Sequence, residues 1–321
     1  MVYDCIPFFN EIDMLKLRLH ILDPYVDRFV IEEATMTFSG EPKELFFQQN
    51  AYKFKAFAHK ITHIVVDNTP VLAGTHERDY FQKNRLIEGL EGATEDDIIL
   101  FGDCDEIPNP KVLQGIIKTF DKTKVYHLAQ ENCYAYMNMV ETSGTLLSIT
   151  GDFPEIPVRE RKWLGTKITS TLNIPKEGIV RLRDLVPVTD LRSVRVENGG
   201  WHFGYMGGEH ELNVAKRIGV KVKAAAHQEY NDEEVLRETL DHLILGRDMF
   251  GRDATFQQVE IDDSYPQYLR DNLEQYSHFI LPEITGLRRL CARFDLSVGR
   301  TFRKAVRKLR RLSERRKEQT P

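Results

Sequence analysis

The chain has 321 residues, of which 41% are hydrophobic and 29% are charged, and its formal net charge at pH 7 is −5. A chain of this length and apolar content can bury the core of one large domain, and its acidic body argues against a nucleic-acid-binding protein. No stretch reaches the roughly eighteen apolar residues of a membrane-spanning helix, and the N-terminus lacks the basic segment and apolar run of a signal peptide.

The cysteines are scattered and include no CxxC pair; they are Cys5, Cys104, Cys133 and Cys291. This spacing favours neither a disulfide framework nor a zinc site built from thiolates. A reduced, cytoplasmic setting is therefore expected.

Strand-like and helix-like patterns alternate through the first half of the chain. We predict strands at residues 1–8, 27–34, 60–67 and 96–103, and amphipathic helices at residues 11–26 and 77–93. This alternation is typical of an α/β fold in which helices flank a mostly parallel central sheet. In such sheets ligands bind beyond the carboxyl ends of the strands.

The second half carries a different pattern. Residues 121–200 are richer in β signal and turns, including GIVRLRDL at residues 178–185, and they predict additional strands and loops over the sheet. Helical patterns return at residues 209–282, where Asp232 is placed to cap a helix. We assign residues 1–282 to one domain and residues 283–321 to a C-terminal helical extension.

Residues 300–317, RTFRKAVRKLRRLSERRK, predict a basic amphipathic helix. Phe302, Val306, Leu309 and Leu312 fall on one face at helical spacing, and Lys and Arg dominate the rest. Such a helix can lie on an anionic membrane surface, which would place the protein at the inner face of a membrane. The alternatives are a solvated terminal helix and a contact with an acidic partner.

The segment DDIILFGDCDEIPNP, residues 96–110, carries the strongest chemical signal. A strand that looks buried is followed directly by Asp103, Asp105 and Glu106. Carboxylates at positions i and i+2 beyond a strand end can converge through the turn on one hard cation. We therefore expect Asp103 and Asp105 to bind Mn²⁺ or Mg²⁺, which would neutralise a diphosphate.

Three interpretations of this acidic segment stay open. The first is the DxD element of a nucleotide-sugar glycosyltransferase, and the second is the site of a haloacid-dehalogenase-type phosphatase with Asp103 as nucleophile. In the third, the acids only begin the helix predicted at NPKVLQGII, residues 109–117. The phosphatase interpretation is the weaker enzyme candidate, because the motif lies far from the first strand and Ile107 stands where Thr or Val is usual.

Six blocks stand out along the chain: YDCIPFFNEIDMLKLRLHIL, VDRFVIEEATMTFSGEPK, QKNRLIEGL, DIILFGDCDEIPNP, GGWHFGYMGG and AHQEYN. Their residues and their order resemble glycosyltransferase family 17, which includes β-1,4-mannosyl-glycoprotein β-1,4-N-acetylglucosaminyltransferases, and the resemblance covers roughly residues 2–275. It implies a GT-A-type fold, a UDP-sugar donor and inversion at the anomeric carbon, and it favours GlcNAc as the sugar transferred.

The resemblance also assigns donor-binding residues, at the ends of the first two strands, on the second helix and in the acidic and glycine-rich blocks. They are Pro7, Asn10, Glu11, Glu33, Ala34, Thr35, Lys83, Asn84, Arg85, Asp103, Cys104 and Trp201. Glu33 could accept a hydrogen bond from the uracil imide or the ribose. Lys83 stands where the family commonly has Arg, so a point charge would replace a bidentate contact with the diphosphate.

The block GGWHFGYMGG supplies aromatic and metal-binding candidates. Trp201 and Tyr205 offer flat surfaces on which a sugar or a base can stack, and His202 is a candidate third metal ligand beside Asp103 and Asp105. Simple core packing is the alternative for each aromatic ring, as it is for Trp163, a candidate for stacking against the acceptor.

An inverting transfer needs one general base to deprotonate the acceptor hydroxyl, and no second carboxylate as nucleophile. We place Glu209 first because it follows the glycine-rich turn, with Asp152 and Glu229 as further candidates. Glu155 and Glu211 are alternatives, and any one of these acids can equally be an ordinary surface residue.

Animal members of the family carry an N-terminal membrane helix, whereas this sequence begins almost at its first predicted strand. We therefore expect a cytoplasmic enzyme, possibly peripheral on a membrane, that acts on a saccharide, a lipid-linked glycan or a glycoprotein. A non-enzymatic alternative is a carbohydrate-binding or membrane-associated scaffold whose transferase site has decayed, for example at Lys83.

Overall fold

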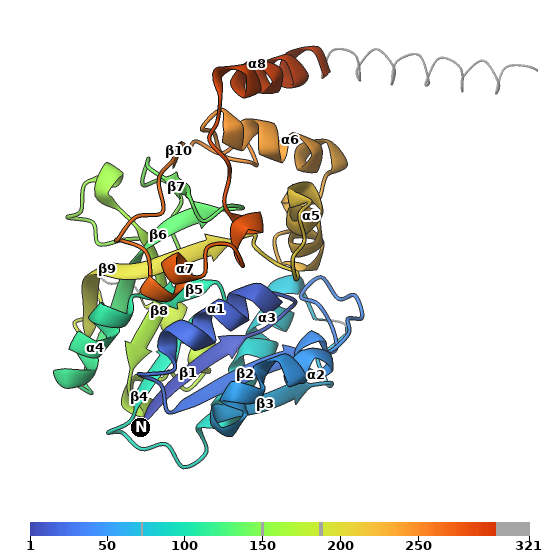
Figure 1. Cartoon of the computed structure of the whole chain (residues 1–321). Coiled ribbons are helices and arrows are strands. Elements are labelled where there is room, and N and C mark those ends of the chain that lie inside the picture. Colours follow the sequence, from blue (N-terminus) through green and yellow to red (C-terminus); the bar gives the residue numbers. More distant parts are fainter. Residues whose placement is uncertain (72, 149–150, 186–188, 300–321) are drawn as a thin grey trace, which may run out of the picture.

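The computed structural model describes residues 1–71, 73–148, 151–185 and 189–299, and it has a mixed α/β architecture built on one curled sheet (Figure 1). The strands are β1 (Val2–Pro7), β2 (Arg28–Ala34), β3 (Ile61–Val66), β4 (Ile98–Phe101), β5 (Glu106–Pro108), β6 (Val125–Tyr134), β7 (Met139–Glu141), β8 (Trp163–Thr169), β9 (Ser193–Gly204) and β10 (Phe256–Gln258). The predicted α/β class is confirmed.

The α-helices are α1 (Ile12–Leu22), α2 (Phe46–Asn50), α3 (Thr75–Asn84), α4 (Pro110–Lys118), α5 (Val214–Ala224), α6 (Glu233–Ile244), α7 (Gln267–Asp271) and α8 (Gly286–Phe294). Shorter helical segments used below are η2 (Arg85–Leu90), η5 (Ile179–Asp184), η7 (Ser277–Phe279) and η8 (Asp295–Gly299). Among the described helices, none has the length and apolar character needed to span a membrane.

The sheet is parallel at one end and mixed at the other. Strands β3, β2, β1 and β4 pair in this order and all in parallel. The prediction of a mostly parallel sheet is not confirmed, because antiparallel pairs join most strands of the other half. The order continues through β8, β6, β7 and β10 by antiparallel pairing, while β9 lies parallel to β6 and pairs with β5. The antiparallel β6–β7 pair follows from its short connection, which cannot make a parallel crossover.

Both faces of the parallel part are buried, because successive residues of β1 point to opposite sides. Val2 and Ile6 join the core that α1 covers, whereas Tyr3 and Cys5 join a second core against η2 and η5. A third core lies between α5, α6 and the β7–β10 edge of the sheet.

Helix α1 also buries a charge against the sheet. Arg18 is fully buried and donates from Nε and Nη2 to the two carboxylate oxygens of Asp4, at 2.7 and 2.6 Å. Its remaining amino group, Nη1, donates to the backbone carbonyls of Asp103 and Glu106, at 3.0 and 2.6 Å. One side chain thus joins β1, α1 and the loop that follows β4.

Local predictions in the second half have mixed outcomes. Asp232 caps α6 by accepting from the backbone amides of Glu234 and Val235, as expected. The segment GIVRLRDL is not a strand; most of it forms the 3₁₀ segment η5. Gly178 turns the chain there with a φ of 122°, and the Asn84 side chain accepts from the Val180 amide, which removes a donor that a strand would need.

Arg18→Met should lower the free energy of unfolding by about 3–5 kcal/mol, because Asp4 would stay buried without its counter-ion. Urea denaturation followed by circular dichroism measures this loss. The double variant Asp4→Val with Arg18→Met removes both charges and should recover part of the stability. A loss of less than about 1 kcal/mol in the single variant, as for an exposed ion pair, would contradict this role.

Candidate functional site

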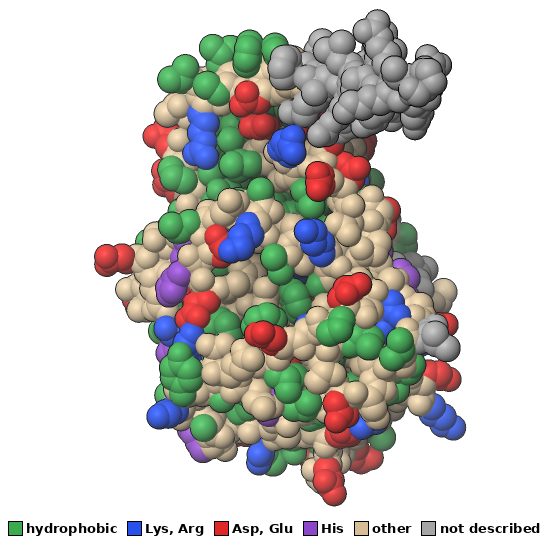
Figure 2. Space-filling view, turned by 90° about the vertical axis from the view of Figure 1, so that its right-hand side faces the viewer, with side chains coloured by type: hydrophobic (Ala, Val, Ile, Leu, Met, Phe, Trp, Pro, Cys, Tyr) green, Lys and Arg blue, Asp and Glu red, His purple; other side chains and the backbone are tan. Residues whose placement is uncertain are grey.

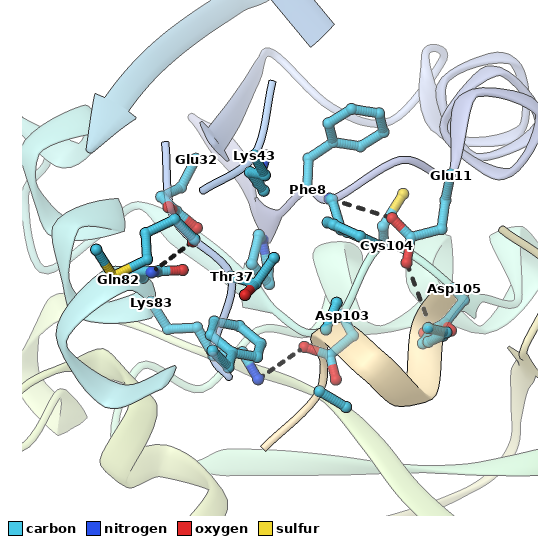
Figure 3. Close-up of a pocket in the computed structure, with 17 residues that line it drawn as sticks. Phe8, Glu11, Glu32, Thr37, Lys43, Gln82, Lys83, Asp103, Cys104 and Asp105 are labelled. Atoms are coloured by element: carbon cyan, nitrogen blue, oxygen red, sulfur yellow. Dashed lines mark hydrogen bonds and ion pairs between the residues drawn. The ribbon is translucent and has the colours of Figure 1, made fainter. Parts of the chain in front are cut away.

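A pocket lies beyond the carboxyl ends of β1, β2 and β4 (Figure 3). The loops after these strands line it, together with α3 and the C-terminal part of α5. The parallel strands end at one edge of the sheet, so segments from opposite halves of the sequence meet there. The pocket therefore occupies the position predicted from the strand pattern.

The acidic loop after β4 faces this pocket. Asp103 lies 3.2 Å from Nζ of Lys83 and 3.1 Å from Nη2 of Arg183, both measured from its Oδ1. Asp105 forms an ion pair with Lys221 of α5, whose Nζ is also 3.5 Å from Oε1 of Glu11. Figure 3 shows Lys83 directed at Asp103 across the pocket floor. Each carboxylate of the DxD element thus already has a cationic partner.

Glu106 stabilises the acidic loop through hydrogen bonds to its buried carboxylate. Its fully buried carboxylate accepts from the Asp103 amide at 2.9 Å, from Nε1 of Trp163 at 2.9 Å and from Nη2 of Arg183 at 3.1 Å. A Cβ at Gly102 would come within 2.8 Å of this carboxylate, so only glycine fits where strand β4 meets the loop. The third acid of the segment is therefore a structural residue.

The cations around the loop keep Asp103 ionised. Burial alone would raise the pKa of Asp103, but Arg183, Lys83 and Lys221 together lower it below its usual value. The pKa of Lys221 is raised despite the opposing effect of burial, because Asp105 and Glu11 stabilise its charge. Asp103 and Lys221 are therefore both charged at physiological pH.

His202 lies beside Asp105 but outside the pocket lining. Burial lowers the pKa of His202, so the ring is neutral at physiological pH. Its Nδ1 is 2.9 Å from Oδ1 of Asn132, and its Nε2 is 3.8 Å from Oδ1 of Asp105. In the tautomer that donates from Nδ1, the Nε2 lone pair and the Asp105 carboxylate face each other as two acceptors. That arrangement suits a cation between them.

The aromatic candidates of this region pack against other protein side chains and do not line the pocket. Trp201 is buried in the core and stacks on Phe203 and Tyr265, so it does not line the pocket. Trp163 instead stacks on His202, with ring centroids 4.4 Å apart. Tyr205 is packed among other aromatic side chains.

The structure divides the predicted donor-binding and metal-binding residues into two groups. Those that line the pocket are Pro7, Glu11, Lys83, Asp103, Cys104 and Asp105. Those outside its lining are Asn10, Glu33, Ala34, Thr35, Asn84, Arg85, Trp201 and His202. Asn84 bonds to the η5 segment and Arg85 pairs with Glu88, and neither of these two residues lines the pocket.

The two glutamates of β2 point in opposite directions. Glu33 accepts from the backbone amides of Phe47 and Gln48 and thereby holds the start of α2. Glu32 lines the pocket, is 2% exposed, and its Oε1 has no hydrogen-bond partner among the described residues. Burial is the main cause that raises the pKa of Glu32 to about 8, against the opposing effect of Lys43 and Lys83.

The proposed general bases are all paired away from the pocket lining. Glu209 is 2.5 Å from Nζ of Lys53, and Glu229 is 3.1 Å from Nδ1 of His227. Asp152 is buried against Arg195 at 2.8 Å, which indicates a structural ion pair.

Sequence reasoning missed several residues of the pocket. Lys43, Gln82, Lys221 and Arg183 contribute polar groups to the pocket or its acidic loop, and Phe38 contributes an aromatic wall. Lys221 has no signal in its helical segment, because its role depends on a contact with a residue more than a hundred positions earlier. Glu32 could have been found from strand alternation, since it follows Val30 on the face opposite α1.

One other group could hold a metal ion. The ligand atoms of Asp13, His210 and His278 lie within 4.8 Å of one another. Among the described residues, this is the group of three His, Cys, Asp or Glu side chains that lie close enough together to hold a metal ion. Nε2 of His278 is 3.0 Å from Oδ2 of Asp13. His210 adopts a φ of 46°, which turns its backbone amide onto the same carboxylate.

Comparison with known proteins matches the N-terminal part of the chain. Residues 1–148 match the model of glycosyltransferase family 17. The chain is 29% identical over 116 residues to the β-1,4-mannosyl-glycoprotein 4-β-N-acetylglucosaminyltransferase of Rattus norvegicus, covering 33% of this chain and 21% of that protein. The Homo sapiens protein of the same name is 30% identical over 108 residues, covering 31% and 20%.

The chain therefore spans about a fifth of the length of these relatives. A solved structure, the inositol-1-phosphate CTP transferase from T. maritima, aligns with 88% of this chain and 97% of its own at 11% identity, but its TM-score of 0.32 is too low to support an argument. The first 148 residues, which supply Lys83 and the DxD element, match glycosyltransferase family 17, and the resemblance inferred from the sequence is confirmed for these residues.

Proposed function

We propose that this protein is a metal-dependent, inverting glycosyltransferase of the GT-A type that moves GlcNAc from UDP-GlcNAc to a saccharide acceptor. The observation that carries the proposal is the pairing of Asp103 with Lys83 and of Asp105 with Lys221 in one pocket at the carboxyl ends of β1, β2 and β4. The match to glycosyltransferase family 17 supports a transferase over a phosphatase or a decayed scaffold.

The residues present fit a divalent cation. Asp103, Asp105 and Glu11 offer the carboxylate oxygens that Mg²⁺ and Mn²⁺ prefer, and His202 presents an unprotonated nitrogen to Asp105. Asp103 and Asp105 would hold the ion, which supplies positive charge against the leaving diphosphate. Lys221 must then give up part of its contact with Asp105.

The pocket also suits the diphosphate and the base. Lys43, Lys83 and Lys221 line it and can neutralise phosphate oxygens when the donor replaces their present partners. Phe8 and Phe38 supply aromatic surface for a nucleobase. We assign contact with uracil to Glu32, which lines the pocket, rather than to Glu33, which holds α2.

Glu209 remains our proposed general base. It lies on the loop after β9, where the amide of Gly208 donates to the carbonyl of Asn10 beside the pocket, and its present partner Lys53 is on the surface. Asp152 and Glu229 are less suitable because the first is buried in an ion pair and the second is exposed beside His227.

The acceptor and the location follow from the same proposal. A saccharide, a lipid-linked glycan or a glycoprotein would supply the hydroxyl group, and the enzyme would act in the cytoplasm at the inner face of a membrane. The basic segment 300–317, to which we assigned contact with anionic lipid, lies outside the described residues.

Asp103→Asn should weaken Mn²⁺-dependent UDP binding by roughly 10–100-fold and abolish UDP-GlcNAc turnover, because it removes a metal ligand. The fold should be kept, since Lys83 retains Asp79 and Arg183 retains Glu106 as partners. Isothermal titration calorimetry with UDP, with and without Mn²⁺, measures the affinity.

His210→Ala is the matched control, because it removes a ligand from the group of Asp13, His210 and His278 instead. It should leave Mn²⁺-dependent UDP binding unchanged. If this variant loses the metal dependence and Asp103→Asn keeps it, the metal assignment to the DxD element is wrong.

Glu32→Gln should change the pH dependence of stability. In the wild type the pKa of Glu32 is raised from 4.5 to about 8, so in this window the folded protein holds a proton that the unfolded chain releases, and stability falls as pH rises. Gln cannot ionise, so the stability of the variant does not fall with rising pH for this reason. Its free energy of unfolding should equal that of the wild type near pH 4 and exceed it above pH 8 by on the order of a few kcal/mol.

Urea titrations across this pH range make the comparison, with Glu41→Gln as a control for the loss of one exposed acid on the neighbouring loop. A difference between Glu32→Gln and the wild type that stays constant with pH would show that Glu32 is ionised in the folded protein.

A further inference from the structure

The outer face of α8 is an apolar stripe. Leu287, Leu290 and Phe294 are 72%, 62% and 61% exposed, and Val298 on the next turn, η8, is 45% exposed. Their spacing of three, four and four residues places them on one side of the helix. Large apolar side chains gathered in this way on a surface mark an interaction site more often than isolated ones do.

The inner face of the same helix is anchored to the protein. Ala292 and Leu296 are buried, α8 packs against α6, and the Thr285 side chain caps the first turn. The body of the protein therefore fixes which side of α8 faces outward. Helix α8 forms the upper end of the molecule in Figure 1, and hydrophobic side chains crowd that same end in Figure 2.

Arginines border the apolar stripe. Arg289 and Arg293 are exposed, and with Arg288 they lie on the flanks of the helix rather than among the leucines. The sequence beyond Val298 continues with a high density of Arg and Lys in residues 300–317. Within residues 286–299 three arginines stand beside one acid, Asp295, so this helical segment has a positive net charge although the chain as a whole has a net charge of −5.

We propose that the outer face of α8 (Leu287, Leu290, Phe294 and Val298) inserts into the surface of an anionic lipid membrane. Apolar side chains on one face and arginines beside them are the features of a helix that lies at the boundary between headgroups and acyl chains. A second copy of this chain fits less well, because two such faces would bring their arginines together. The helix lies parallel to the membrane and holds the protein on it in one orientation.

This inference does not depend on the proposed transferase activity, because membrane binding is measured without a donor. If both hold, the acceptor is presented at a membrane surface, which favours a lipid-linked saccharide or a membrane glycoprotein. Failure of membrane binding would remove the proposed membrane location and leave the proposed transferase activity untouched, and loss of the transferase activity would leave membrane binding untouched.

Sedimentation of the full chain with lipid vesicles tests the inference. Vesicles of phosphatidylcholine alone are compared with vesicles that also contain phosphatidylglycerol. The wild type should bind the anionic vesicles. The affinity of the double variant Leu290→Glu with Phe294→Glu for these vesicles should be lower by a factor of about ten or more. Both positions are exposed, so the variant should keep the wild-type circular dichroism spectrum and melting temperature.

The matched control is Leu191→Glu with Leu212→Glu, which places the same charges at leucines that are 92% and 77% exposed elsewhere. It should bind vesicles like the wild type apart from a small general effect of charge. The double variant Arg289→Glu with Arg293→Glu should bind anionic vesicles more weakly than the wild type. The binding that remains should depend less on salt concentration.

Cys291 gives a direct reading of insertion, because it is exposed on α8 while Cys5, Cys104 and Cys133 are buried. A polarity-sensitive fluorophore on Cys291 should shift to the blue when anionic vesicles are added. Equal vesicle binding by the wild type and the Leu290/Phe294 variant would overturn the inference, since residues outside α8 would then carry the affinity. Absence of wild-type binding would also overturn it, and a dimer that this variant dissociates would identify a second copy as the occupant.

Discussion

The buried guanidinium of Arg18 is the interaction on which the pocket depends. It neutralises Asp4 within strand β1 and also binds the carbonyls of Asp103 and Glu106, so the helix, the first strand and the acidic loop share one polar centre. A buried charge of this kind is tolerated only when its donors are satisfied, and here the loop after β4 supplies the missing acceptors. The position of the DxD element is thereby fixed by the core rather than by contacts at the surface.

Around that fixed loop, the proposed function requires a ligand to replace the protein partners of the charged groups. Asp103 is held by Lys83 and Arg183, and Asp105 by Lys221, while Glu106 keeps Arg183 in place from below. A nucleotide diphosphate that arrives with a divalent cation brings both signs of charge. The lysines can then pair with phosphate oxygens and the carboxylates can bind the metal ion, so that no buried charge is left without a partner of opposite sign.

The sequence predicted the parts of this arrangement that depend on local pattern. Strands β1 to β4, helix α1 and the position of Asp103 and Asp105 beyond a buried strand follow from periodicity and from the acids that end it. Roles that depend on side-chain direction or on distant contacts did not follow. The family resemblance predicts donor contacts for Glu33 and Trp201, but Glu32 faces the pocket and Trp201 packs in the core. Lys221 reaches Asp105 only through the packing of α5, which no local pattern reveals.

The proposed function requires this pocket to bind a uridine diphosphate sugar together with a metal ion. The most direct test is a thermal-shift panel of UDP, UDP-GlcNAc, UDP-Glc, UDP-Gal, GDP-mannose and CMP, each with and without Mn²⁺, because a ligand of the native state raises the melting temperature. The account predicts a rise for the uridine diphosphates that depends on Mn²⁺ and is largest for UDP-GlcNAc. An unchanged melting temperature with every nucleotide, in a protein that unfolds cooperatively, would contradict it.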